Sequence, residues 1–177
     1  INAHALKGHQ GIVACPNCTT IVTVMPLKPL HDAGRLTRVI ATSYQAVSGA
    51  GVNGVEELRE QTLAWARGEA TTPKYFPHQI AFNVIPHIDK FVEGGYTGEE
   101  MKLVNEIRKV LELPDLRISP TTVRVPVFTA HSVAVNAETE RAVGPDRARE
   151  LFAAFPGLTL WDDPAQNRYP MPIAVEG

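Results

Sequence analysis

The chain has 177 residues, of which 44% are hydrophobic and 20% are charged, and its net charge is −2 at pH 7. This length is enough for one domain with its own hydrophobic core, and so weak a charge gives no reason to expect nucleic-acid binding. No apolar stretch approaches the roughly 20 residues that cross a membrane, and no signal-peptide pattern opens the chain. Because two cysteines are too few for a disulfide scaffold, we expect a cytoplasmic location.

Apolar spacing predicts helices and strands in the first half of the chain. Residues 21–31 have helical spacing, and Pro26 and Pro29 are expected to bend that helix. The elements expected next are a strand over 38–44, a helix over 52–67, a loop rich in threonine and proline through His78, a buried strand over 80–85 and a turn over 93–95.

The second half begins with a helix signature. Thr97-Gly98-Glu99-Glu100 matches the capping-box pattern Thr-x-x-Glu, and apolar residues follow at helical spacing. The elements expected after it are two strands or one bent strand over 123–127 and 133–135, a helix from Pro145 to about Phe155, and a short strand over 158–161. These signals predict an α+β domain: a mixed β-sheet with helices packed on one face.

The segment from Gly11 to Thr20 carries the first candidate for chemistry, Cys18. An apolar run ends at Pro16-Asn17 and a helical pattern starts directly after it, so we expect Cys18 where a strand gives way to a helix N-terminus. Free N–H groups and the helix dipole favour an anion there, and a thiol so placed can titrate at roughly 3.5–7.5 instead of about 8.5. We therefore predict that Cys18 is a nucleophile that bonds covalently to a substrate carbonyl.

Three other interpretations of this cysteine are open. Cys18 can be a small buried hydrophobic residue, as many single cysteines are. Cys15-Pro16-Asn17-Cys18 is also a Cys-x-x-Cys pair, a spacing that suits a dithiol redox centre. A zinc site is the weakest interpretation, because a second pair or suitably spaced histidines are missing from the sequence pattern. We predict no metal site.

The segment 49–54 matches Gly-x-Gly-x-x-Gly after a strand and before a helix. That pattern can mark a dinucleotide-binding turn. The following helix does not lead into a strand that ends in an acidic residue, as that fold requires. A tight turn beside an active site is the interpretation we favour.

Two further pairs of residues are candidates. His131 follows Arg124 by seven positions, so on one straight strand the two would face opposite sides. A shared site needs a bulge or turn, which Pro126 or the residues before His131 can supply; otherwise His131 is a hydrogen-bonded core residue. Glu99 and Lys102 lie at i and i+3 on one helix face, and that spacing alone favours a surface ion pair.

Five segments in order resemble the aspartate-semialdehyde dehydrogenases. They are Pro16-Asn17-Cys18-Thr19-Thr20, Ser43-Tyr44-Gln45-Ala46-Val47-Ser48-Gly49-Ala50-Gly51, Ala81-Phe82-Asn83-Val84-Ile85-Pro86, Glu99-Glu100-Met101-Lys102 and Val123 through His131. The resemblance covers nearly the whole chain. It implies the catalytic-domain fold of glyceraldehyde-3-phosphate-dehydrogenase-like enzymes and the NADPH-dependent reduction of L-aspartyl-4-phosphate to aspartate semialdehyde and phosphate, through a cysteine thioester, in the biosynthesis of lysine, threonine and methionine. N-Acetylglutamyl-phosphate reductase, a related possibility, fits the second and fourth segments less well.

Matching positions carry the family's residue roles onto this chain. The resemblance implies that Cys18 is the nucleophile, that His131 handles the proton of the thiohemiacetal and that Gln45 orients the substrate. The remaining roles that it implies are Arg124 for the substrate carboxylate, Glu99 for its amino group, Lys102 for its phosphate, Asn17 as a further substrate contact, and Ser48 and Gly49 near the nicotinamide end of NADP.

The resemblance also implies that this chain is one part of a larger enzyme. The family's NADP-binding Rossmann domain precedes the cysteine segment and is absent from these residues, so we expect 1–177 to be a single catalytic and dimerisation domain that forms a homodimer, or a tetramer. Two alternatives stay open: the isolated domain can be an inactive dimerisation fragment, or Cys15 and Cys18 can form a redox switch. Cys15 departs from the family, which usually has a non-thiol residue there.

Overall fold

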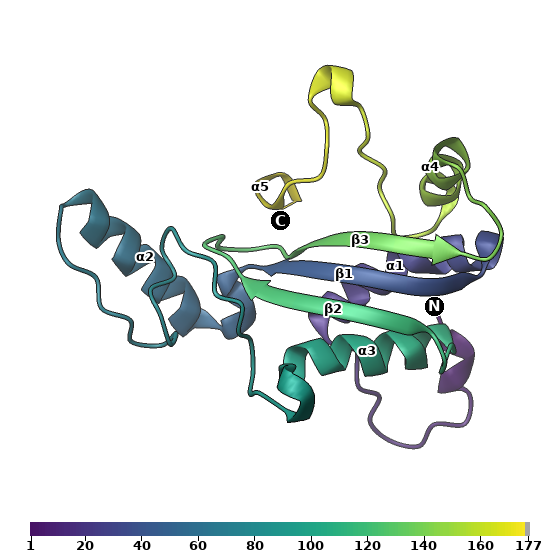
Figure 1. Cartoon of the computed structure of the whole chain (residues 1–177), viewed down its shortest axis with the longest axis horizontal. Coiled ribbons are helices and arrows are strands. Elements are labelled where there is room, and N and C mark those ends of the chain that lie inside the picture. The colour runs from purple at the N-terminus through teal and green to yellow at the C-terminus, as the bar shows by residue number, and fades with distance from the viewer. Residues whose placement is uncertain (176–177) are drawn as a thin grey trace.

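The computed structural model describes residues 1–175, which form a three-stranded mixed sheet with helices around it (Figure 1). The central strand β1 (Leu36–Gln45) pairs in parallel with β2 (Arg117–Arg124) and antiparallel with β3 (Ser132–Thr139). The signal at 133–135 lies in β3, whereas the signal at 123–127 overlaps only the end of β2, which begins at Arg117 and ends at Arg124. The two strands lie on opposite sides of β1. The predicted α+β class with a mixed sheet is confirmed.

Helices α1 (Cys18–Gly34) and α3 (Gly98–Leu111) pack against each other and against the sheet. Successive residues of a strand point to opposite faces, and in β1 the buried Val39 and Ala41 face these helices while Tyr44 is exposed. Each fully buried aliphatic side chain there contributes about 1.5–3 kcal/mol. The main core consists of Val24, Leu27, Leu36, Val39, Ala41, Leu103, Ile107, Val110, Leu111 and Leu116.

The start of α3 confirms the predicted capping box. The Thr97 hydroxyl accepts a hydrogen bond from the Glu100 N–H at 3.3 Å, and the Glu100 carboxylate accepts one from the Thr97 N–H at 2.8 Å. The helix ends where Glu112 adopts a left-handed conformation with φ of 59°. Two basic residues in the last turn, Arg108 and Lys109, complement the negative end of the helix dipole.

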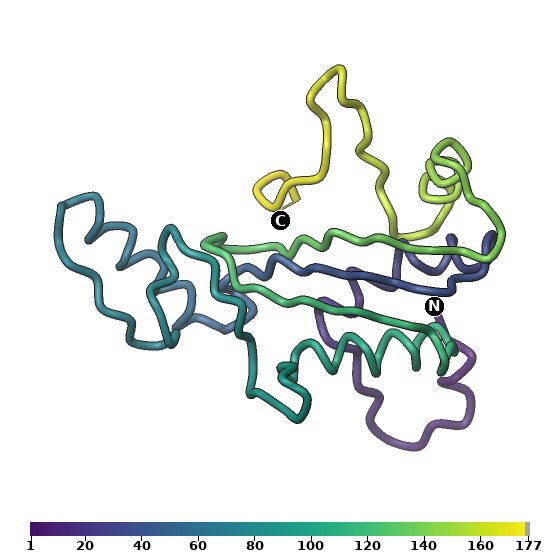
Figure 2. The backbone as a smooth tube through the Cα atoms, viewed as in Figure 1, coloured from purple at the N-terminus to yellow at the C-terminus, as the bar shows by residue number. Residues whose placement is uncertain are grey.

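α1 is longer than the predicted 21–31 and continues through both Pro26 and Pro29. The strand expected before Cys18 was wrong. Residues 11–16 form no strand, and Ile12 is completely exposed, so this apolar segment neither pairs nor is buried within residues 1–175. Figure 2 shows it as part of the purple loop that runs beside α3.

A second, smaller core lies beyond one end of the sheet, under α2 (Val52–Ala66) (Figure 1). The buried strand predicted over 80–85 was also wrong. Ile80 and Ala81 are buried, but their N–H groups both donate to the side-chain oxygen of Gln61, at 2.9 and 3.0 Å. Phe82 has a φ of 60°, which no strand accommodates. A side chain therefore satisfies the N–H groups of Ile80 and Ala81, and Ile85, the last residue of the predicted segment, pairs with Arg124 of β2 in an isolated bridge.

The C-terminal part adds α4 (Pro145–Ala154), which contacts α1 and begins with proline at its first position, as predicted. The strand predicted over 158–161 was wrong. Gly157 has a φ of 85° and Leu158 closes a turn onto the Phe155 carbonyl, after which the chain leaves the sheet (Figure 2). The remaining short helices are η1 (Ala3–Leu6), η2 (Val47–Ala50), η3 (Glu93–Gly95), η4 (Pro164–Gln166) and α5 (Pro172–Val175). No helix within residues 1–175 is both long and apolar enough to span a membrane.

Candidate active site

Three candidate residues lie side by side at one end of the sheet. Gln45 is the last residue of β1 and its register partner is Arg124, the last residue of β2. On the other side, β3 starts at Ser132 opposite Tyr44, so His131 comes directly before it. Neighbouring strands are about 4.8 Å apart, so the topology alone gathers these three side chains.

The structure brings His131 and Arg124 into one site, despite their odd spacing. The chain turns between β2 and β3, where Ala130 has a φ of 63°. Both side chains border Gly49: a Cβ there would lie 2.9 Å from His131 Nε2 and 3.0 Å from Arg124 Nη1. The turn that a shared site required is therefore present.

The same contacts explain the glycine motif. Gly49 lies in η2 against His131 and Arg124, and Gly51 adopts a φ of 80° at the start of α2. A Cβ on Gly54 would lie 2.8 Å from the Val47 carbonyl oxygen. These glycines form a tight turn beside the candidate site, and α2 leads into a loop rather than a strand, so the dinucleotide-fingerprint interpretation of the motif is wrong.

Cys18 is the first residue of α1, and its thiol is exposed. The helix-terminus half of the prediction is therefore confirmed, and the buried-residue interpretation is wrong. Asn17 caps this helix: its side-chain oxygen accepts hydrogen bonds from the N–H groups of Thr19 and Thr20, at 2.9 and 3.3 Å. The thiol consequently lies at the positive end of a capped helix.

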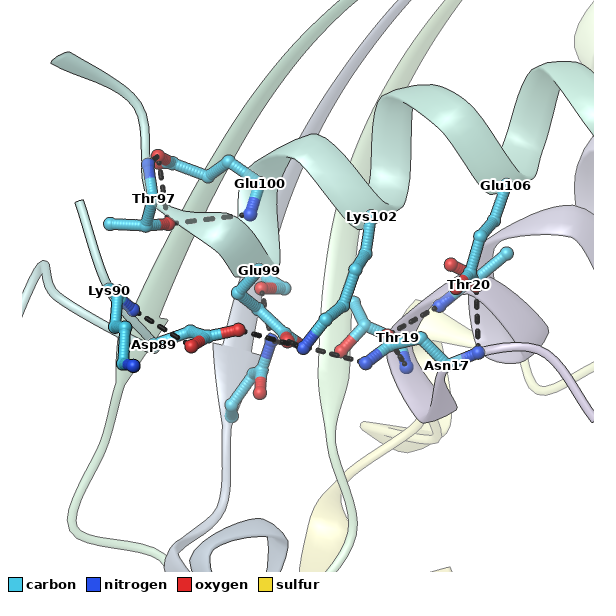
Figure 3. Close-up of polar contacts among 12 residues, drawn as sticks. Asn17, Thr19, Thr20, Asp89, Lys90, Thr97, Glu99, Glu100, Lys102 and Glu106 are labelled. Atoms are coloured by element: carbon cyan, nitrogen blue, oxygen red, sulfur yellow. Dashed lines mark hydrogen bonds and ion pairs between the residues drawn. The ribbon is translucent and has the colours of Figure 1, made fainter. Parts of the chain in front are cut away.

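Glu99 connects the helix that begins at Cys18 to the end of the sheet (Figure 3). Its Oε1 accepts one hydrogen bond from Asn17 Nδ2 and another from Gln45 Nε2, both at 3.0 Å. Glu99 is only 5% exposed, so the interpretation as a surface ion pair is wrong for this carboxylate. A buried carboxylate needs such donors, because leaving one unpaired costs several kcal/mol.

Lys102 lies between two carboxylates (Figure 3). Its Nζ is 3.4 Å from Glu99 Oε2 and 2.9 Å from Asp89 Oδ2. The hydrogen bond to Asp89 raises the pKa of Lys102, and the same bond lowers the pKa of Asp89. The ammonium therefore stays charged beside Glu99 while remaining partly exposed, as a group that binds an anion from solution must be.

Burial and charge tune the other two polar groups. Burial, and then the nearby Arg124 charge, lower the pKa of His131, whereas Glu99 raises it. Burial also lowers the pKa of Arg124, and the charges of Glu99 and Cys18 oppose this effect.

Sequence reasoning missed three contributors to this site. Ala46 acts through its main chain, which no side-chain pattern reveals: its carbonyl accepts from Arg124 Nη1 at 2.8 Å and its N–H donates to His131 Nδ1 at 3.0 Å. Asp89 comes from a loop. Glu106, which accepts a hydrogen bond from the Asn17 N–H, follows Glu99 by seven residues on α3, and that two-turn spacing was a usable signal. Within residues 1–175, no group of three or more His, Cys, Asp or Glu side chains is arranged to hold a metal ion.

The chain is similar to known proteins in sequence and in fold. A family model described as "Semialdehyde dehydrogenase, dimerisation domain" matches residues 27–177. Aspartate-semialdehyde dehydrogenase of Aquifex aeolicus is 48% identical over 169 residues, covering 95% of this chain and 50% of that protein. A crystal structure of aspartate semialdehyde dehydrogenase II from Vibrio cholerae, complexed with ASA, matches with a TM-score of 0.89 at 39% identity, over 94% of this chain and 48% of that one.

A more distant similarity extends the fold alone. The aspartate semialdehyde dehydrogenase of Candida albicans, crystallised with NADP, matches with a TM-score of 0.57 at 24% identity, over 85% of this chain and 38% of its own. The chain spans about half the length of the curated relatives that it matches. The resemblance seen in the sequence is confirmed, and the chain belongs to the semialdehyde dehydrogenase family, of which it contains the dimerisation domain.

Proposed function

We propose that the full-length protein containing this chain is an aspartate-semialdehyde dehydrogenase, which reduces L-aspartyl-4-phosphate with NADPH to aspartate semialdehyde and phosphate. The observation that carries the proposal is the position of Glu99, whose Oε1 accepts hydrogen bonds from both Asn17 and Gln45. This carboxylate joins the helix terminus that bears Cys18 to the strand ends that bear the other polar groups. A nucleophile, a proton carrier and three charged groups thus belong to one connected site.

Cys18 is the nucleophile in this proposal. Its thiolate attacks the acyl carbon, the carbon–oxygen bond to phosphate breaks, and a thioester on Cys18 forms. Reduction then converts the thioester to a thiohemiacetal, whose carbon–sulfur bond breaks to release the aldehyde and the thiolate. The exposed position at the start of α1 supports this role, because the positive end of a helix dipole stabilises a thiolate.

His131 handles the proton on the thiohemiacetal oxygen. The Ala46 N–H occupies Nδ1, so the neutral ring carries its proton on Nε2 and donates that N–H to the thiohemiacetal oxygen. The lowered pKa keeps the ring largely neutral near pH 7. Gln45 orients the substrate from the neighbouring strand end.

Each charged residue of the site binds a different group of the substrate. Arg124 uses one of its five N–H donors on the Ala46 carbonyl, which leaves enough for a bidentate contact with the substrate carboxylate. Glu99 has one free acceptor position on Oε2 for the substrate amino group, once its contacts with Asn17, Gln45 and Lys102 are counted. Lys102 binds the phosphate.

Ser48 and Gly49 would hold the nicotinamide end of NADP. Both are exposed, and Gly49 has no side chain to lie between a flat ring and the neighbouring His131 and Arg124. When bound, this cofactor supplies the hydride. Most of its contacts are assigned to the nucleotide-binding domain of the longer protein, and a homodimer of the dimerisation domain is the assembly we propose.

The experiment is a cysteine exchange in the full-length protein. We expect Cys18→Ser to lower phosphate-dependent oxidation of aspartate semialdehyde by at least about a thousandfold, as loss of a catalytic nucleophile does elsewhere. Cys15→Ser is the matched control and should keep its activity, since Cys15 lies outside α1. Undiminished turnover in Cys18→Ser would end the proposal.

A second function rests on the exposure of both thiols. A Cys15–Cys18 disulfide, formed with transfer of two electrons to glutathione disulfide, would block the nucleophile. Mass spectrometry at cytosolic glutathione ratios tests it, and two free thiols throughout that range would exclude it. The isolated 177 residues are expected to form a dimer without turnover, and sedimentation with the same assay decides that point.

A further inference from the structure

The N-terminus of α1 has only half of a capping box in its own sequence. Asn17 supplies the first half, because its side chain accepts from the N–H of Thr20, the third helical residue. In a complete box a Glu or Gln at that third position accepts the N–H of the cap residue in return. Here the third position is threonine, which leaves the Asn17 N–H without its usual partner within the helix.

A glutamate from another helix fills the vacant role. The Asn17 N–H donates to Glu106 Oε2 at 2.7 Å, within the range of a charge-assisted hydrogen bond (Figure 3). By contrast α3 completes its own box locally, with Glu100 accepting the Thr97 N–H at 2.8 Å. The two helices thus use the same chemistry, but α1 takes its acceptor from 89 residues further along the chain.

Two glutamates, two turns apart on α3, therefore each accept a hydrogen bond from Asn17, the residue that caps α1. Glu99 holds the Asn17 side chain at 3.0 Å and Glu106 holds its main-chain N–H. Because a rigid helix spaces the two carboxylates, together they fix the position and the direction in which α1 starts. The residue that follows Asn17 is Cys18.

We propose that Glu106 is a positioning residue for Cys18, completing in trans the capping box of the helix that carries the nucleophile. The inference rests on the proposed function for Cys18 and deepens it. Glu106 has its effect through the Asn17 main chain, so it fixes where the thiol lies and which N–H groups surround it. A displacement of about 1 Å at a reacting group can cost about a hundredfold in rate.

Two variants of the full-length protein separate the hydrogen bond from the charge. Glu106→Ala removes both, whereas Glu106→Gln keeps an acceptor oxygen and removes the charge. We expect Glu106→Ala to speed hydrogen exchange at the Asn17 amide by at least about tenfold and to lower kcat by about tenfold or more, with KM within about twofold. Glu106→Gln should stay within about threefold of the unmodified protein in both measurements.

The matched control is Glu112→Ala. Glu112 follows the last residue of α3 and bonds His4 of the N-terminal segment at 2.7 Å, so its loss should leave exchange at Asn17 and kcat unchanged. If Glu106→Ala alters neither quantity, or if Glu106→Gln is as impaired as Glu106→Ala, the positioning role is wrong. The alkylation rate of Cys18 with iodoacetamide provides a readout separate from turnover. Should Cys18→Ser retain turnover, the proposed function fails instead, and exchange at Asn17 still reports on the Glu106 bond.

Discussion

The imidazole of His131 accepts a hydrogen bond at Nδ1 from the main-chain N–H of Ala46, at 3.0 Å. A main-chain N–H can only donate, so the neutral ring must carry its own proton on Nε2. The Ala46 carbonyl meanwhile accepts from Arg124 Nη1 at 2.8 Å. The main chain of Ala46 therefore orients both the imidazole of His131 and the guanidinium of Arg124.

This bond makes a prediction for the tautomer of His131. A proton on Nδ1 would point at the Ala46 N–H, so two donors would face each other without an acceptor. Burial further disfavours the charged ring, which carries protons on both nitrogens. We expect nitrogen NMR spectra at pH 7.5 to show His131 protonated at Nε2 alone, with a pKa below 6.5. A ring protonated at Nδ1 would contradict the assignment.

The lowered pKa of His131 also predicts how stability depends on pH. Between the folded pKa and about 6.5, the unfolded chain binds more protons than the folded one, so the free energy of unfolding falls as the solution is acidified through that window. His131→Asn should lose less stability than the unmodified chain between pH 7.5 and 5.5, in urea titrations. Burial also lowers the pKa of His31. Because His31 is present in both proteins, its contribution to the pH dependence cancels in the comparison. Equal slopes for the two proteins would refute the prediction.

Gly49→Ala tests how tightly the candidate site is packed. The added methyl group would lie 2.9 Å from the His131 ring and 3.0 Å from Arg124 Nη1, so these side chains must move. We expect turnover of the full-length protein to fall by about a hundredfold, while overpacking costs about 1–3 kcal/mol of stability. Gly144→Ala is the control, since nothing lies within 4 Å of its new Cβ. Full activity in Gly49→Ala would show that the site does not need His131 and Arg124 where they lie.

Glu99→Ala should be costly for stability as well as for binding. It leaves the buried Gln45 amide and the Asn17 amide without their common acceptor, and each unsatisfied buried group costs about 1–3 kcal/mol. We expect a loss of about 2–5 kcal/mol in urea unfolding. Glu150→Ala, which breaks an exposed pair with Arg147, should change stability by less than about 0.5 kcal/mol. Equal effects of the two substitutions would show that the Glu99 contacts are not stabilising.

Leu103→Ala tests the packing of α3 on the sheet. Leu103 is fully buried in the main core, so its truncation leaves a cavity and should cost about 2–5 kcal/mol. Leu63→Ala, at a position 51% exposed on α2, should cost well under half as much. A similar midpoint shift for both variants in thermal unfolding would place Leu103 outside the stabilising core.

Local chemistry decided which parts of this fold could be predicted. The capping box at Thr97 and the proline at the start of α4 are signals contained within one turn, and both helices begin where predicted. The strand over 80–85 failed because Gln61, 19 residues earlier in the chain, satisfies the N–H of Ile80. A buried segment that pairs with no strand has the same run of apolar residues as a buried strand, so the sequence pattern cannot separate the two.

The candidate site divides in the same way. Cys18 was recognisable because a helix pattern begins around it, and α1 does start there. The neighbourhood of Gln45, Arg124 and His131 depends on which strands pair, and only long-range contacts determine that. Ala46 and Glu106 act on main-chain groups or through them, which residue types alone do not reveal.

The pairing of Gln45 with Arg124 across β1 and β2 has a consequence for how this domain can change. Hydrogen bonds between strands set the separation of these side chains, so insertions or deletions in the loop over 67–79, which joins neither strand directly, can alter chain length without displacing them. A slip of one residue between the strands would instead bring Val123 or Val125 opposite Gln45 and turn the guanidinium toward the other face. Variation in length is therefore tolerable in that loop, whereas one step of strand register would separate the Gln45 and Arg124 side chains.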